Sequence, residues 1–139
     1  MSYRWLEHTS EVALQIDAPS EKGVFEQALV ALGELIGDHD GGDAADEGEA
    51  SRLDVELTVA AGDRAALLAS FLEELVYLAE THGLVPERAK RLELTGGRLT
   101  ATVCGHRGGS RHVVKGVTYH ELTFAPRGDR FAATVVLDV

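Results

Sequence analysis

The chain contains little cysteine, proline or tryptophan. Its 139 residues include one cysteine, Cys104, together with three prolines and one tryptophan. A single cysteine cannot form an internal disulfide, and a cysteine-based zinc site cannot be assembled from it alone. No apolar run approaches the roughly 20 residues that a membrane-spanning helix needs, and no basic segment with an apolar run behind it opens the chain. The sequence therefore predicts a soluble, cytoplasmic protein without a membrane partner.

Basic residues are also scarce. Thirteen Lys and Arg stand against 23 Asp and Glu, which gives a formal net charge of -10. Proteins bind a phosphate backbone through clustered Lys and Arg, so this negative net charge argues against strong direct binding of nucleic acid. Acidic proteins bind cations or basic protein surfaces, although a negative balance is commonly only a solubility feature. A role connected with RNA would have to be indirect.

Several common catalytic patterns are missing as well. The chain contains no Gly-x-x-x-x-Gly-Lys-Ser/Thr phosphate loop, no Gly-x-Ser-x-Gly and no His-Glu-x-x-His. A small domain without a nucleotide loop or an evident nucleophile is better suited to bind and assist than to catalyse.

Hydrophobic periodicity predicts a first strand over residues 12–17 and two amphipathic helices. Ser20 is placed to cap the first helix, which ends at Gly37. Asp63 is placed to cap the second helix, and Gly83 fits the left-handed residue that ends it. The two apolar stripes consist of Val24, Phe25, Ala28, Leu29, Leu32, Leu35 and Ile36, and of Leu67, Leu68, Phe71, Leu72, Leu75, Val76 and Ala79.

The rest of the chain alternates as strands or has the composition of loops. Residues 38–50 hold six acids and no basic residue, which indicates a flexible acidic loop, and residues 105–112 indicate a basic, glycine-rich loop. With about seven strands, the sequence predicts one α+β domain over residues 1–139, a two-layer architecture in which both helices cover one face of a largely antiparallel sheet. Further strands are predicted over 53–59, 91–95, 99–103, 113–125 and 131–139, with hairpin turns at 96–97 and 126–130.

Oxygen ligands gather near both ends of the chain. Residues 7–11, Glu-His-Thr-Ser-Glu, bring carboxylate, imidazole and hydroxyl groups together just before a strand. Such a set can bind a divalent cation, and it is equally compatible with simple solvation. Asp138 and the carboxylate of Val139 follow an apolar strand. Either this strand end is held in position, or an edge strand merely ends there.

The segment from Lys115 to His120 forms a third polar group. The apolar phase of its strand shifts between Tyr119 and Leu122, which predicts a bulge near His120. Bulges redirect side chains at functional sites, and a histidine that forms a hydrogen bond within the core explains the same residue comparably well.

Taken together, these segments resemble the archease family, and the match runs in order over nearly the whole chain. Its most specific part is the Lys-x-Val-Thr-Tyr-His strand in combination with both termini. The matching segments are residues 8–11, which resemble a His-Thr-Ala-Asp signature, residues 71–75 with 83–85, residues 114–120, and residues 137–139.

The resemblance implies an α+β fold and an accessory, non-enzymatic role beside an RtcB-type RNA ligase. Archeases are understood to promote guanylylation and multiple turnover of that ligase in tRNA splicing and RNA repair. The resemblance also implies a divalent cation held by Glu11, Asp138 and Val139. We hypothesise that His8, Lys115 and His120 support this site or contact the ligase, and no residue is assigned a catalytic role.

One departure from the family affects the expected metal. The usual aspartate is Glu11 here, and its extra methylene moves the carboxylate by about a bond length. Calcium, with its flexible geometry, tolerates this change better than magnesium. We therefore expect calcium in the isolated protein, and magnesium or manganese as alternatives in the ligase complex.

Two other functions are compatible with the same residues. One is a stand-alone metal-dependent hydrolase that uses these carboxylates with His120 or His8 as general base. The other is a chaperone-like module that binds basic RNA-processing proteins through its acidic surface.

Overall fold

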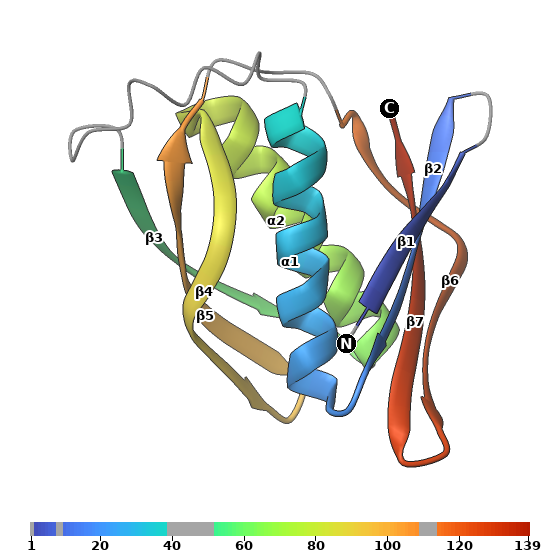
Figure 1. Ribbon diagram of the computed structural model, residues 1–139. Coiled ribbons are helices and arrows are strands. Elements are labelled where there is room, and N and C mark those ends of the chain that lie inside the picture. The colour runs from blue at the N-terminus through green and yellow to red at the C-terminus, as the bar shows by residue number, and fades with distance from the viewer. Residues whose placement is uncertain (1, 8–9, 39–51, 109–113) are drawn as a thin grey trace.

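The computed structural model describes residues 2–7, 10–38, 52–108 and 114–139 (Figure 1). Residues 39–50 of the predicted acidic loop and residues 109–112, half of the predicted basic loop, lie outside the described residues. The elements in chain order are β1 (Ser2–Glu7), β2 (Glu11–Ala18), α1 (Glu21–Asp38), β3 (Arg52–Ala60), α2 (Arg64–His82), β4 (Leu84–Thr95), β5 (Arg98–Arg107), β6 (Gly116–Arg127) and β7 (Arg130–Asp138).

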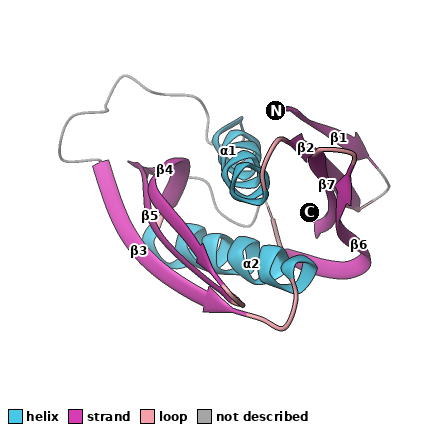
Figure 2. Cartoon of the chain, turned by 90° about the horizontal axis from the view of Figure 1, so that it is seen from below, coloured by secondary structure: helices cyan, strands magenta, loops and turns pink. Residues whose placement is uncertain are grey.

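The α+β class, with two helices and antiparallel strands, is confirmed. The strands form two sheets where the sequence predicted one, in the orders β1-β2-β7-β6 and β3-β5-β4. Figures 1 and 2 show the helices between them: α1 packs against β2 and β4, and α2 packs against β6 and β3. Helix α1 needs cover from two sides because neighbouring residues, such as Val24 and Phe25, are both fully buried.

The predicted start of each helix and the predicted end of α2 are confirmed, whereas α1 continues to Asp38, one residue beyond its predicted end at Gly37. The Ser20 hydroxyl accepts a hydrogen bond from the Gly23 N–H at 3.0 Å, in front of α1. The Asp63 carboxylate accepts one from the Ala66 N–H at 2.7 Å, in front of α2. Gly83 ends α2 in the left-handed region, with φ 69°.

The strands depart from the prediction in several places. Strand β4 begins at Leu84, whereas the strand was predicted to begin at residue 91. The second hairpin is tighter than expected, because only Gly128 and Asp129 form the turn. Residues 105–107 extend β5 instead of opening a loop, since Gly105 pairs with Leu53 on one side and Pro86 on the other. Strand β1, which the sequence analysis did not identify, pairs with β2 along its whole length.

Aromatic rings join the helices to the first sheet. Phe25 of α1 lies 5.9 Å from Phe71 of α2 and 5.6 Å from Phe124 of β6, measured between ring centroids. Such pairs add to the burial of apolar area and fix the helices against the sheet. Within the described residues, no helix is long and apolar enough to cross a membrane.

Candidate metal centre

The first residue of β2 and the last residue of β7 lie directly opposite each other. Glu11 pairs with Asp138 in the antiparallel register, and the adjacent pair, Val12 with Leu137, is buried in the core. Because side chains alternate along a strand, both carboxylates lie on the outer face of the sheet. The fold therefore brings two acids from opposite ends of the chain onto one surface.

The local hydrogen bonds make this pair a close one. The Val139 N–H donates to the Ser10 carbonyl at 3.1 Å, so that Ser10 and Val139 form a hydrogen-bonded pair. Pairs alternate along an antiparallel ladder, which makes Glu11 and Asp138 a non-hydrogen-bonded pair with Cα atoms about 4.5 Å apart. In such pairs the side chains approach each other most closely.

The end of β7 is held from both sides. Strand β7 is a central strand, between β2 and β6, so the interpretation of an edge strand that merely ends at Asp138 is wrong. The Lys115 N–H donates to the Asp138 carbonyl at 2.7 Å, and Gly116 pairs with Asp138. Together with the bond from Val139 to Ser10, these contacts fix the position of the two acids.

The two carboxylates have the chemistry of an incomplete cation site. Both residues are half-buried, and among the described residues neither one forms an ion pair. Two like charges side by side repel each other, and a cation between them removes that repulsion. Oxygen donors of this kind fit a hard divalent ion.

Side chains alone do not complete a metal shell here. The part of the chain that the structure describes contains no cluster of three or more His, Cys, Asp or Glu suited to a metal ion. The third predicted ligand, Val139, follows Asp138 directly in the chain. Binding of a cation by Glu11, Asp138 and Val139 therefore stays a prediction. The pairing of Glu11 with Asp138 is compatible with it.

The structure places two of the three predicted supporting residues, and they lie at different points near or along β6. Lys115 lies beside the acid pair through its main chain, and its side chain is exposed. His120 lies in the predicted bulge of β6, which is confirmed by a break in register between Thr118 and Thr123. Its side chain is 69% exposed and lies 3.1 Å from the Glu121 carboxylate, so the interpretation of a core histidine is wrong. His8 lies outside the described residues.

The backbone around His120 is unusual. Glu121 has φ 56°, and it is the one non-glycine residue with positive φ in the described part of the chain. This conformation is uncommon for residues other than glycine, and here it lies within the break in register of β6. The bulge could be predicted because the apolar phase of the strand shifts in the sequence. The position of Gly116 opposite Asp138 could not, because it depends on the register between β6 and β7.

These features define a class: α+β proteins with two helices between two antiparallel sheets and an acid pair where two central strands meet. Residues 3–139 match the family model of the archease protein family (MTH1598/TM1083). The chain belongs to the archease family.

Relatives and solved structures agree with this assignment. The chain is 27% identical over 146 residues to protein archease of Methanosarcina barkeri, covering 99% of this chain and 95% of the relative. It is 28% identical over 147 residues to protein archease of Methanopyrus kandleri, with both chains fully covered.

Two solved structures share the fold. The solution structure of Methanobacterium thermoautotrophicum protein 1598 superposes with a TM-score of 0.68 at 22% identity, over 99% of this chain and 98% of that one. The crystal structure of a Thermotoga maritima archease, described as a possible chaperone, gives 0.63 at 20% identity, over 96% and 94%. At these low sequence identities, the structural similarity supports a shared fold and nothing further.

Proposed function

We propose that this protein is a cytoplasmic accessory factor that activates an RtcB-type RNA ligase in tRNA splicing or RNA repair. In this proposal Glu11, Asp138 and Val139 hold a divalent cation on the surface that faces the ligase. The observation that carries the proposal is the direct pairing of Glu11 with Asp138, two acids that lie 127 positions apart in the sequence (138 minus 11). Membership of the archease family supports an accessory role.

The residues of the site have separate tasks. Glu11 and Asp138 supply the negative charge that attracts the cation, and the hydrogen bonds at Ser10 and Lys115 keep the strand ends in register. A bound divalent cation supplies charge neutralisation for phosphate oxygens. Calcium fits the longer Glu11 side chain best in the isolated protein, and magnesium or manganese would serve in the complex.

The position of His120 weakens one form of the hydrolase alternative, in which His120 is the general base, whereas the other proposed base, His8, lies outside the described residues. His120 lies beyond Thr118 along β6, and its ring nitrogen faces Glu121 instead of the acid pair. A general base has to reach the proton that it removes, directly or through one water. The free carboxylates at the strand ends therefore support ion binding more directly than catalysis.

The chaperone alternative has one supporting observation, the description of the Thermotoga maritima archease as a possible chaperone. It predicts that this protein protects several unrelated basic proteins from aggregation, with no preference for one client. An RNA ligase cofactor would instead act on its own ligase at stoichiometric or lower ratios.

The proposal is tested by a ligation assay with the cognate ligase and an excess of RNA ends. We expect the ligase alone to stop after about one turnover, and this protein to restore repeated turnover because it promotes renewed guanylylation. Equal amounts of product per ligase with and without the protein would contradict the proposed function. Serum albumin at the same concentration controls for non-specific stabilisation.

A further inference from the structure

The outer face of the first sheet changes its chemistry from one end to the other. Around the acid pair it is acidic, and in the middle it is lined by small or apolar side chains, among them Ala13 and Val136. Near the β6–β7 turn it becomes basic, with Arg127 and Arg130 in one row. Ala132 and Asp138 are six positions apart along β7, which places the two ends about 20 Å apart.

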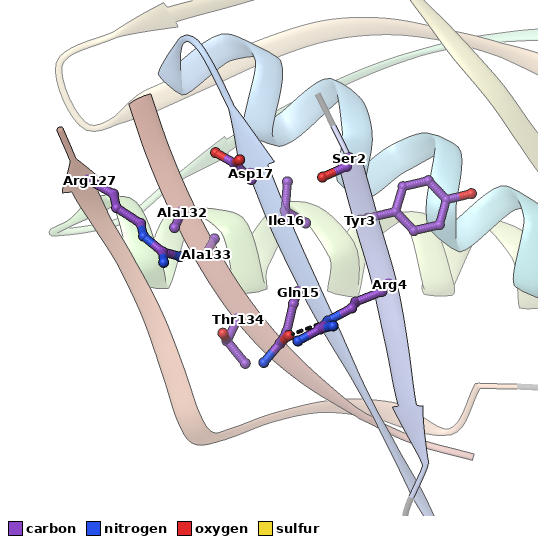
Figure 3. A pocket seen from close by; sticks show the side chains of 10 residues that line it. All are labelled: Ser2, Tyr3, Arg4, Gln15, Ile16, Asp17, Arg127, Ala132, Ala133 and Thr134. Carbon is purple, nitrogen blue, oxygen red and sulfur yellow. Dashed lines mark hydrogen bonds between the residues drawn. The ribbon is translucent and has the colours of Figure 1, made fainter. Parts of the chain in front are cut away.

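A hollow of about 470 Å³ lies at this basic end. Figure 3 shows that its two arginines come from the two edge strands, Arg4 from β1 and Arg127 from β6, and that both point inward over the central strands. Ala132, Gln15 and Thr134 lie beneath them. The alanine leaves room above the sheet, and the amide and hydroxyl groups offer hydrogen bonds.

Acids in the described part of the chain do not neutralise the charges of these two arginines. The Arg4 Nε donates to the neutral amide oxygen of Gln15 at 2.9 Å. Among the described residues, no carboxylate forms an ion pair with Arg4 or Arg127. The one acid of the hollow, Asp17, is already paired with Arg130 at 3.0 Å. Two guanidinium groups therefore retain free donors over a common space.

We propose that this hollow binds a small phosphate-bearing molecule, held between Arg4 and Arg127 with Thr134 and Gln15 beneath it. The planar guanidinium fork matches the oxygens of a phosphate, and two forks from opposite sides can clamp a single phosphate or pyrophosphate group. Arg4 lies in the row of Gln15 and Thr134, whereas Arg127 lies opposite Arg130, four residues further along β7 (134 minus 130). The two arginines are therefore about 14 Å apart across the sheet and about 13 Å apart along it, a diagonal that two long side chains can bridge through one ligand. This site is separate from the acid pair and does not depend on the ligase proposal.

The charge of the whole chain favours a small ligand over a polymer. A nucleic acid that crossed this face would meet a protein of net charge -10, with Glu11 and Asp138 on the same sheet. A small anion needs only the local positive field of the hollow. The volume of the hollow also lies within the ordinary range for small-molecule sites.

The test is a calorimetric titration of the full chain with inorganic pyrophosphate, repeated with inorganic phosphate. We expect saturable binding, weakened roughly tenfold or more by either Arg4→Gln or Arg127→Gln because each removes charged hydrogen bonds. Arg98→Gln is the matched control, an equal loss of charge at an exposed position on the second sheet. It should change the affinity less than twofold.

Three results would overturn the proposal: no saturable binding, equal weakening by Arg98→Gln, or tighter binding of a short oligoribonucleotide than of pyrophosphate. Amide chemical shifts provide a second readout that does not depend on the variants. Pyrophosphate should move the amide signals of Gln15 and Thr134, and shifts confined to other residues would also count against the site.

Discussion

An Asp138→Asn variant should bind Ca²⁺ at least about 100-fold more weakly than the wild-type protein. Removal of one unit charge a few ångströms from a divalent ion costs several kcal/mol at the effective dielectric of a protein surface. Asparagine keeps the size and the backbone contacts of residue 138, so the fold is preserved. Calorimetric titration measures the loss directly, and the Ca²⁺-dependent rise in unfolding temperature measures it independently.

Two further variants make this result specific. Asp129→Asn removes the same charge at an exposed position in the β6–β7 turn and should leave Ca²⁺ affinity unchanged. Glu11→Gln should weaken binding to a similar extent as Asp138→Asn, because both carboxylates hold the ion. If Asp138→Asn bound Ca²⁺ as tightly as the wild type, or if Glu11→Gln had no effect, the paired site would be wrong.

A Gly33→Ala variant should lower the free energy of unfolding by about 1–3 kcal/mol. A Cβ atom at this position of α1 would collide with the Pro86 carbonyl oxygen of β4, and neither backbone can move freely in the packed core. The close approach of α1 to β4 joins the helix layer to the second sheet, so the collision disturbs both. Urea unfolding followed by circular dichroism measures the change.

Gly37→Ala is the control on the same helix. Its Cβ would meet Val85 Cγ1 at 3.6 Å, an ordinary contact. Alanine favours the helix over glycine by up to about 1 kcal/mol, so this variant should be as stable as the wild type or more stable. A Gly33→Ala protein that is as stable as Gly37→Ala would show that α1 and β4 do not pack as closely as described.

Local sequence patterns correctly predicted those structural features that depend only on neighbouring residues. Ser20, Asp63 and Gly83 act within one turn of a helix, and the bulge near His120 followed from a shift in strand phase. Gly105 was misinterpreted for a reason that is not local. Glycine commonly marks a loop, but here it lets β5 lie against Val85, whose carbonyl oxygen a Cβ at this position would hit.

The division into two sheets could not be predicted from alternation. Alternation tells which face of a strand is buried, not which strand lies beside it. Strands β2 and β7 pair although more than 100 residues separate them, and only that register places Glu11 opposite Asp138. The resemblance to a family implied this pairing of the chain ends, whereas the hollow between Arg4 and Arg127 had no counterpart in the sequence analysis.

We propose that the acid pair of Glu11 and Asp138 is what an RtcB-type ligase needs from this protein. The most direct test is the rate of ligase guanylylation in the presence of wild-type protein, Asp138→Asn or Asp129→Asn, each verified as folded. We expect stimulation by the wild type and by Asp129→Asn, and none by Asp138→Asn. Full stimulation by folded Asp138→Asn would contradict it.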